Sequence, residues 1–286
     1  MECIDISGAR AKGPQNFIFG YGSLIEDESR QRTTPSARDA WPARVEGIRR
    51  GWWARGAASG LTTTYLGAIA DPKATCNGVI YEVSAEQLAA TDRRESAGYQ
   101  RCRIDIGKIT MLDGRTQPLD GLVWAYINLI PPDKIADNLP TPQFPMVQSY
   151  VDICIHGCLE VEGKYPTAAG FTQEFIATTD EWSRYWVNDR VYPRRPFIFQ
   201  PASDQIDTAL QNAPRTAELF YEVEIEPASW EDRKPVWFIL AALTGFSQAL
   251  AGSPGMAALQ ARTLRQPRFA PPAAARARPP LAAPVR

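Results

Sequence analysis

The stretch FIFGYGSL, at residues 17–24, is where the fold of this chain is decided. Its first three residues are apolar β formers and predict a short, buried strand. Gly20 and Gly22 permit backbone angles that other residues rarely adopt, so the chain can turn sharply there and present its N–H groups. A turn of this kind after a strand can bind a carboxylate, a phosphate or a developing oxyanion. The alternative is an ordinary glycine turn after a core strand.

Strand patterns continue from this turn to about residue 130. Runs at 45–53, 60–70 and 76–83 alternate in polarity or are β-branched, and each predicts a strand. Asp71-Pro72-Lys73 predicts a turn between the second run and the third.

One helix interrupts these strands. Ser84 can cap a helix, and the residues after it predict that this helix runs to about Glu95. Beyond it, runs at 99–110 and 119–130 predict two strands joined by a hairpin turn at Asp113-Gly114. Because most strands follow one another without helices, we predict an α+β fold: a mixed, mostly antiparallel, barrel-like sheet with an embedded helix, plus a mainly helical C-terminal extension.

We divide the chain into four segments on these patterns. A proline-rich break follows residue 130, and beyond it residues 146–160 and 171–186 show the apolar spacing of helices. The predicted segments are a short N-terminal arm at 1–15, a sheet domain at 16–130, a helical extension packed on it at 131–230, and an apolar run with a disordered Ala/Pro/Arg-rich tail at 231–286.

Composition and charge exclude several classes of function. The chain has 286 residues, 44% hydrophobic and 22% charged, so it can bury a core like an ordinary globular protein. Its formal net charge of -1 argues against a nucleic-acid-binding surface. The apolar run that begins at Val236 is shorter than the roughly 20 residues of a membrane span. Nothing in the sequence fixes an oligomeric state.

The cysteines and the N-terminus favour a cytoplasmic protein. Five irregularly spaced cysteines, in a chain too large to need disulfides, indicate free thiols in a reducing compartment. Residues 1–16 contain no apolar run of the kind that a signal peptide needs.

A histidine-based catalytic or metal site is not expected. His156 is the only histidine, and helical geometry puts it on the side of its helix opposite Cys154 and Cys158. The two cysteines share a face but lack further ligands, so we predict structural roles for all three residues and no bound metal. Gly20-Tyr21-Gly22 lacks the third glycine of a dinucleotide fingerprint and the Lys-Ser/Thr of a Walker loop.

Glu95 is the candidate for proton transfer. It sits where the embedded helix ends, and Gly98 suits the position that closes a helix. The helix dipole and an apolar sheet surface would both disfavour a charged carboxylate there, which suits a general base. The alternative is a surface glutamate paired with Arg93 or Arg94.

Four short motifs, in this order, carry a resemblance to a known family. Together they resemble the γ-glutamylcyclotransferase superfamily, in its ChaC-like and AIG2-like branches, over about residues 15–130. Members of that family share a Tyr-Gly-Ser turn after the first strand and a single catalytic glutamate reached after a helix. The motifs are FGYGSL at 19–24, GIRR at 47–50, CNGVIYEV at 76–83 and RESAGY at 94–99.

The resemblance implies an enzyme that releases 5-oxoproline from a γ-glutamyl compound, such as glutathione or a γ-glutamyl amino acid or amine. The substrate's own α-amine would attack its γ-carbonyl, so the reaction needs no protein nucleophile, metal or cofactor. Glu95 is implied as the general acid and base. The turn would offer its backbone N–H groups to a substrate carboxylate or oxyanion, and an aromatic ring after the helix would pack over the substrate. The implied substrate-binding residues are Tyr21, Gly22, Ser23, Leu24 and Tyr99.

Two alternatives stay open at this level. The fold could be a catalytically inactive binding module, with Trp182, Trp186 and Arg194-Arg195 as anchors for a partner. It could also be a cyclotransferase for another γ-glutamyl amine. Tyr99 could be a core aromatic at the start of a strand, and Arg50 or Arg55 is a secondary candidate for pairing with a substrate carboxylate.

Overall fold

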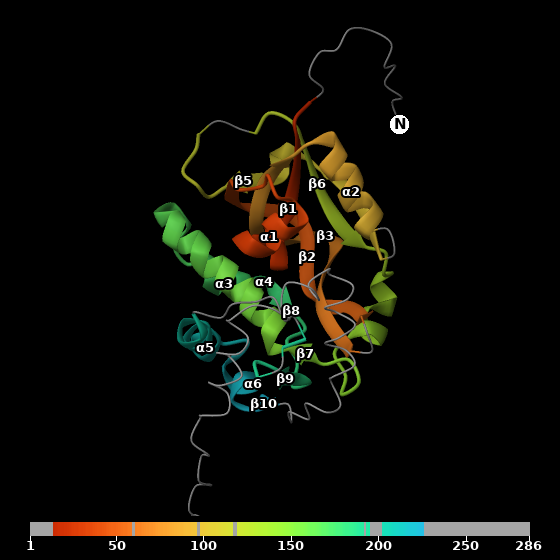
Figure 1. Cartoon of the computed structure of the whole chain (residues 1–286), viewed down its shortest axis with the longest axis vertical. Helices are drawn as coiled ribbons and strands as arrows, with labels where there is room; N and C mark the ends of the chain where they lie inside the picture. Colours follow the sequence, from red (N-terminus) through yellow and green to blue (C-terminus); the bar gives the residue numbers. More distant parts are fainter. Residues whose placement is uncertain are drawn as a thin grey trace, which may run out of the picture. The chain divides into compact units, whose positions relative to one another are not determined.

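The computed structural model of the chain describes residues 14–58, 61–95, 98–116, 119–191, 193–194 and 202–225. All of them lie within one compact unit, Met1–Trp230 (Figure 1). The predicted tail at 231–286 and most of the predicted arm at 1–15 lie outside the described residues.

A seven-stranded sheet forms the centre of this unit, in the order β4-β6-β1-β3-β2-β5, with β8 paired to β2. The β1–β6 and β2–β8 pairs are parallel and the other pairs are antiparallel, so the predicted mixed, mostly antiparallel sheet is confirmed. β4 and β5 lie at its two edges, so the sheet does not close on itself within the described residues. Its strands are β1 (Asn16–Gly20), β2 (Ala40–Ala58), β3 (Leu61–Val83), β4 (Tyr99–Ile104), β5 (Ile109–Met111), β6 (Leu122–Asn128) and β8 (Thr179–Asp180).

β1 is buried on both faces of the sheet, as its unbroken apolar run predicts. Ile18 packs into the core cluster that includes α3 (Gln148–Lys164). Phe17 and Phe19 point to the other face and join the second core cluster, with Val45 and Val123. This strand therefore delivers the glycine turn at its end from a rigid, fully packed position.

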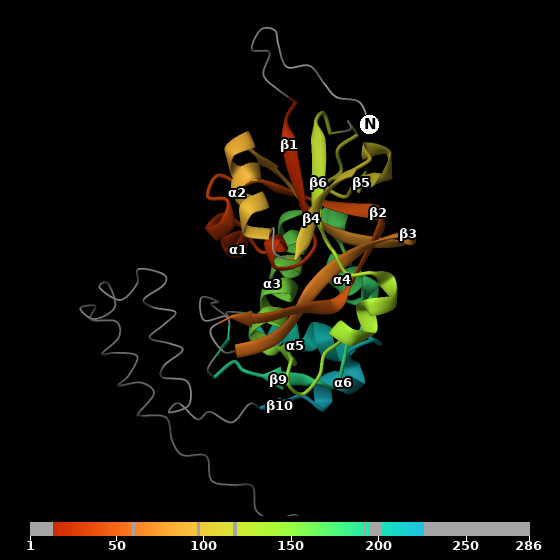
Figure 2. The same cartoon turned by 90° about the vertical axis from the view of Figure 1, so that its right-hand side faces the viewer.

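The long hairpin of β2 and β3 corrects one prediction. The predicted turn at Asp71-Pro72-Lys73 is wrong, because β3 runs through it without a break (Figure 2). The pairing shifts register there, from Glu46↔Thr75 to Ile48↔Ala70, and Gly47 takes a φ of 89° opposite the shift. Only the local hydrogen bond typical of such a turn is present: the Lys73 N–H donates to Asp71 Oδ1 at 3.0 Å. The sequence signal thus marks a bulge in a long strand.

The embedded helix α2 (Ala85–Glu95) is confirmed, together with its N-terminal cap. Ser84 and Gln87 exchange hydrogen bonds between side chains and backbone N–H groups, at 2.8 and 3.2 Å. The chain then enters β4, which pairs antiparallel with β6 as expected. The single strand predicted at 99–110 is wrong: Asp105 caps a 3-10 turn that sends β5 to the opposite edge, beside β2.

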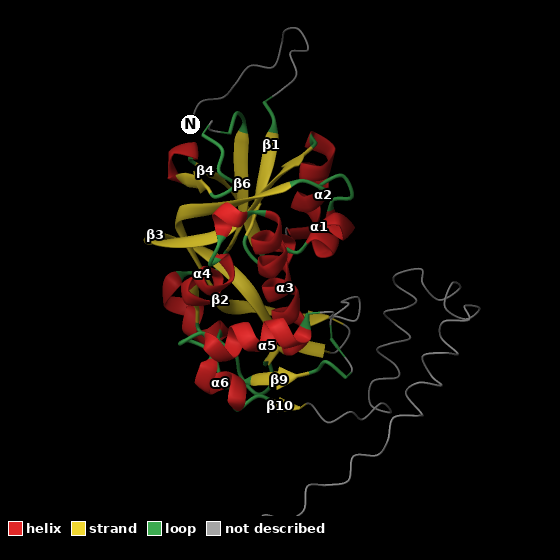
Figure 3. Cartoon of the chain, turned by 90° about the vertical axis from the view of Figure 1, so that its left-hand side faces the viewer, coloured by secondary structure: helices red, strands yellow, loops and turns green. Residues whose placement is uncertain are grey.

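The extension contributes helices and a second, small sheet. α3 is confirmed, but the helix predicted at 171–186 is too long: α4 ends at Thr178, and Thr179–Asp180 pair with β2 instead. β-branched threonines at this junction favour the extended backbone. Figure 3 shows α3 in the middle of the helices; it contacts η1, α4 and α5. The remaining elements are η1 (Ser23–Ile25), α1 (Asp27–Thr33), η2 (Ile106–Lys108), η3 (Pro132–Asn138), β7 (Met146–Val147), η4 (Pro166–Ala168), α4 (Phe171–Thr178), β9 (Trp186–Asn188), α5 (Ser203–Asn212), α6 (Ala217–Tyr221) and β10 (Glu224–Ile225).

Within the described part of the chain, no helix has the length and apolar character needed to cross a membrane.

Candidate active site

The turn after β1 is shaped by close contacts at its glycines. A Cβ at Gly20 would lie 2.8 Å from Leu24 Cβ, and a Cβ at Gly22 would lie 3.2 Å from the hydroxyl of Tyr150. Neither glycine has a φ in the left-handed region. Gly20 therefore leaves the space in which the chain folds back over itself, and Gly22 lets the turn pass close beneath Tyr150 of α3.

Two buried arginines hold the carbonyl oxygens of this turn. Arg50, on β2, is 0% exposed and donates to the carbonyl oxygen of Tyr21 at 3.2 Å. Arg30, on α1, is equally buried and donates to the carbonyl oxygens of Leu24 and Ile25, at 3.2 and 2.9 Å. Both ends of the turn are thus fixed by charge-assisted hydrogen bonds.

Arg50 makes its other contacts with neutral oxygens. It donates to the backbone and side-chain oxygens of Asn77, to the Phe175 carbonyl and to the hydroxyls of Thr178 and Thr179, at 2.7–3.2 Å. Burial lowers the pKa of this guanidinium, and the effect is partly offset by the nearby thiols of Cys76, Cys158 and Cys154 and by Glu174. The candidate role in pairing with a substrate carboxylate is therefore wrong, because the side chain is enclosed and holds the fold.

The N–H groups of the turn contrast with its carbonyls. Among the described residues, none accepts a hydrogen bond from the backbone N–H groups of residues 21–24. The first intrahelical bond of η1 is donated only by Ile25, to Gly22, at 3.0 Å. Four backbone donors are therefore left over at one turn, which is the arrangement that an oxyanion or carboxylate can use.

Tyr21 connects this turn to the other predicted site residues. Its hydroxyl donates to the carbonyl oxygen of Tyr126 at 2.7 Å. Burial, and then the proximity of Tyr99, Tyr150 and Glu95, raise the pKa of Tyr21 well above its usual value. The end of α2, the start of β4 and helix α3 therefore each contribute a group to the raised pKa of Tyr21.

The end of α2 is anchored by a second polar contact. Asp92 accepts hydrogen bonds from the Tyr126 hydroxyl at 2.9 Å and from Arg101 at 2.8 Å. Burial and the Asp92 carboxylate together raise the pKa of Tyr126. Glu95, the last residue of α2, is partly buried and lies three residues after Asp92, on a neighbouring position of the same helix face.

Tyr150 is a site residue that the sequence did not single out. It lies in α3, and its ring packs edge-on against Trp52 and Tyr65, with centroids 5.9 and 4.9 Å away. In the sequence it is one apolar position of an amphipathic helix, and no local signal distinguishes it from a core residue. Its place at the site depends on the close approach of its hydroxyl to Gly22, which lies more than 120 residues away in the sequence.

Of the anchors suggested for a binding module, Trp186 is buried in the core and Trp182 is partly buried. Trp186 is 2% exposed, and Trp182 is packed against the same core, with ring centroids 5.5 Å apart. Arg194 donates to the Thr62 carbonyl, and Arg195 lies outside the described residues.

Comparison with known proteins adds a family match. Residues 18–142 match the model of the family described as gamma-glutamyl cyclotransferase, AIG2-like. This range holds the glycine turn, both buried arginines, α2 and the start of β4. A search of curated proteins gave no match.

Several solved structures are similar to the chain. A gamma-glutamyl cyclotransferase shares 12% identity, covering 68% of this chain and 99% of its own, with a TM-score of 0.41. A yeast cyclotransferase described as specific to glutathione shares 14%, covering 74% and 96%, with a TM-score of 0.35. A protein of Arabidopsis thaliana shares 18%, covering 43% and 76%, with a TM-score of 0.33. At such TM-scores these structures carry no argument, and the family assignment depends on the match over residues 18–142.

Proposed function

Residues 18–142 of this chain are a domain of the AIG2-like γ-glutamyl cyclotransferase family, and from that premise we propose that the protein releases 5-oxoproline from a γ-glutamyl compound. The observation that carries the proposal is the convergence at Tyr21. Tyr21 of the glycine turn is bonded to Tyr126, which in turn is bonded to Asp92 of the helix that ends at Glu95. Besides burial, Tyr99 and Glu95, from two other segments of the sequence, raise the pKa of the Tyr21 hydroxyl.

The proposed reaction uses the substrate as its own nucleophile. Glu95 takes a proton from the α-ammonium group, and the freed amine attacks the γ-carbonyl carbon to close a five-membered ring. The bond between that carbon and the leaving nitrogen then breaks as Glu95 passes its proton to the departing amine, and the ring nitrogen releases its second proton to solvent to give the neutral lactam. Holding the substrate in the folded geometry contributes a large part of the acceleration, since well-oriented intramolecular attack is worth roughly 7–11 kcal/mol.

The turn supplies electrostatic stabilisation in this scheme. The unused N–H groups of residues 21–24 face no acceptor among the described residues, and they bind either the oxyanion or the α-carboxylate. The carbonyls of the same turn are held by Arg30 and Arg50, so the donors do not need to reorganise during the reaction. In other enzymes, removal of one such donor costs about 3 kcal/mol of transition-state stabilisation.

The substrate classes that we propose are glutathione, γ-glutamyl amino acids and γ-glutamyl amines. All share the α-amino acid end and the γ-carbonyl that the mechanism uses, and they differ only in the leaving amine. We further propose a cytoplasmic location, because the four cysteines among the described residues are free thiols and three of them are buried.

A substrate panel tests the proposal directly. The purified full chain is incubated with glutathione and with a series of γ-glutamyl amino acids and amines, and 5-oxoproline is detected by mass spectrometry. We expect release from at least one substrate, and loss of that release in Glu95→Gln. Glu86→Gln is the matched control, since Glu86 is exposed at the other end of the same helix. Binding of a γ-glutamyl compound without any product would favour the inactive binding module.

A further inference from the structure

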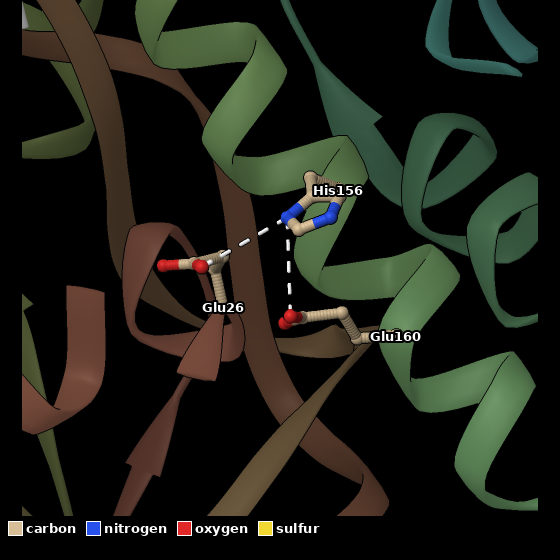
Figure 4. A group of neighbouring side chains, drawn as sticks. All are labelled: Glu26, His156 and Glu160. Atoms are coloured by element: carbon tan, nitrogen blue, oxygen red, sulfur yellow. Dashed lines mark ion pairs between the residues drawn. The ribbon is translucent and has the colours of Figure 1, made fainter. Parts of the chain in front are cut away.

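Three side chains outside the proposed active site converge behind the glycine turn. Figure 4 shows Glu26 from the loop before α1, with His156 and Glu160 from α3. His156 Nδ1 lies 3.8 Å from Glu26 Oε1 and 3.9 Å from Glu160 Oε1. One ligand-type atom from each residue lies within 4.8 Å of the other two.

Helix geometry and a glycine bring these residues together. His156 and Glu160 are four residues apart, so they occupy neighbouring positions on one face of α3. Gly157 allows that face to touch the backbone of the loop: a Cβ there would lie 2.4 Å from the Glu26 nitrogen. The third side chain is therefore held against the other two by contact between main chains.

Each carboxylate is oriented by a backbone N–H group. One oxygen of Glu26 accepts from the Ser29 N–H, and one oxygen of Glu160 accepts from the Asp27 N–H at 3.1 Å. The second oxygen of each carboxylate is the one directed at His156 (Figure 4). Carboxylates that ligate metals are commonly fixed in this way, with one oxygen in a hydrogen bond and the other on the ion.

The charge of the cluster is not balanced by the residues that the structure describes around it. Among the described residues, no lysine or arginine forms an ion pair with Glu26 or Glu160. With His156 protonated, two carboxylates and one imidazolium leave a net charge of about -1 in a half-buried site. A divalent cation bound to a neutral imidazole and two carboxylates leaves the site neutral, which lowers the cost of burial.

We propose that Glu26, His156 and Glu160 bind a divalent transition-metal cation of the Zn²⁺ type, which joins the loop behind the glycine turn to α3. One imidazole nitrogen and two carboxylate oxygens are ligands that such ions accept. Bonds of about 2.1 Å in tetrahedral geometry put ligand atoms about 3.4 Å apart. Binding therefore requires each histidine–carboxylate distance to shorten by about half an ångström, with the two carboxylate oxygens, now within 4.8 Å of one another, drawn to the same separation. Water fills the remaining position, since His156 is 22% exposed.

This inference differs from the sequence-based expectation of no metal. That expectation paired His156 with Cys154 and Cys158, which are buried elsewhere in the core. The ligands that do converge are separated by 130 residues in sequence, and the lone histidine gave no indication of them. The proposal does not depend on the cyclotransferase reaction, because its test is a binding measurement.

Because His156 is the only histidine of the chain, every imidazole signal in an NMR titration belongs to this residue. The protein is prepared without a histidine-containing tag, stripped with a chelator, and carries Cys102→Ser so that the half-exposed thiol does not compete. Zn²⁺ is titrated by calorimetry, and the imidazole nitrogens are followed by ¹⁵N NMR. We expect one equivalent bound, with a metal-induced shift at Nδ1, and weaker binding of Mg²⁺.

Variants decide between this site and adventitious binding. Glu160→Gln keeps the shape of the side chain and is expected to weaken Zn²⁺ binding at least about tenfold, as is His156→Gln. Glu28→Gln, on the exposed ion pair with Arg32, is the matched control and should bind as the parent does. Absence of binding, binding that survives both ligand variants, or an Nδ1 that only takes up a proton would each overturn the proposal.

Discussion

Arg50 donates a hydrogen bond to the carbonyl oxygen of Tyr21 from a fully buried position on β2. The same side chain reaches the Phe175 carbonyl, at 2.9 Å, so one guanidinium connects the glycine turn to the end of α4. The turn is therefore supported by a residue outside the four-residue stretch that would contact substrate. Support of this kind is what keeps catalytic donors in a fixed geometry.

Replacing Arg50 with methionine should destabilise the fold. Several buried carbonyl oxygens would lose their donor, and each unsatisfied group costs about 1–3 kcal/mol. We expect the free energy of unfolding to fall by about 3–5 kcal/mol, measured by chemical denaturation. Arg44→Met is the control: its ion pair with Glu174 is 42% exposed on the arginine side, so the loss there should stay below about 1 kcal/mol. Equal effects of the two changes would contradict the role given to Arg50.

Two glycines of α3 provide a matched pair. A Cβ at Gly157 would lie 2.4 Å from the Glu26 nitrogen, whereas a Cβ at Gly163 would meet nothing within 4 Å. We expect Gly157→Ala to lower the free energy of unfolding by about 1–3 kcal/mol, because backbone must move. Gly163→Ala should raise it by up to about 1 kcal/mol through helix propensity. Thermal or chemical unfolding measures both, and a stabilising Gly157→Ala would contradict the contact.

Asp180 makes stability depend on pH. Burial acts to raise the pKa of Asp180, but hydrogen bonds from Arg49 and Arg215 outweigh it, and the pKa is lowered. A group with a lowered pKa in the folded state stabilises above its ordinary pKa of about 3.9, and that contribution is lost as the pH falls through the folded-state pKa. Asp180→Asn should therefore reduce stability at neutral pH and matter little at about pH 2.

The control for this change is Asp39→Asn, on a side chain that is 80% exposed. Denaturation at a series of pH values should show a difference in the free energy of unfolding between the parent and Asp180→Asn that depends on pH. For Asp39→Asn this difference should be almost zero at every pH. A gap for Asp180→Asn that widens towards low pH would have the wrong sign for this account.

The hydroxyl of Tyr21 should stay protonated and act as a hydrogen-bond donor over the whole pH range in which turnover is measured. Its raised pKa keeps the hydroxyl bonded to the Tyr126 carbonyl at alkaline pH. Tyr21→Phe should cost about 1 kcal/mol of stability for the lost hydrogen bond. If turnover is measured from about pH 6 to about pH 10, the alkaline limb should have the same midpoint in the variant as in the parent. A limb that disappears with the hydroxyl would show that Tyr21 itself titrates.

Much of the central domain could be predicted from local signals. The apolar run of β1, the Ser84–Gln87 cap and the spacing of α3 each act over a few residues, and each element was found where expected. The family resemblance rests on motifs of the same local kind. Such signals are reliable because helix caps and buried strands are decided largely by neighbours in sequence.

What the sequence missed depends on distant contacts. Asp71-Pro72-Lys73 is a good turn in isolation, but pairing with β2 extends β3 through it. The helix predicted to continue past Thr178 stops because β2 offers hydrogen-bonding partners to Thr179 and Asp180. Tyr150 and the cluster around His156 are likewise assembled by packing of α3 on the turn, which no local pattern records.

The central claim is that Glu95 carries out proton transfer for a cyclotransferase reaction. The most direct test is the rate at which Glu95→Gln releases 5-oxoproline from the best substrate of the panel. The variant and the parent are compared at equal protein concentration, after their unfolding curves have been shown to match. General acid–base catalysis typically contributes about 10²–10⁴-fold, so we expect kcat to fall at least about a hundredfold with the melting temperature unchanged. Release of 5-oxoproline at the parent rate by a folded Glu95→Gln protein would contradict the account.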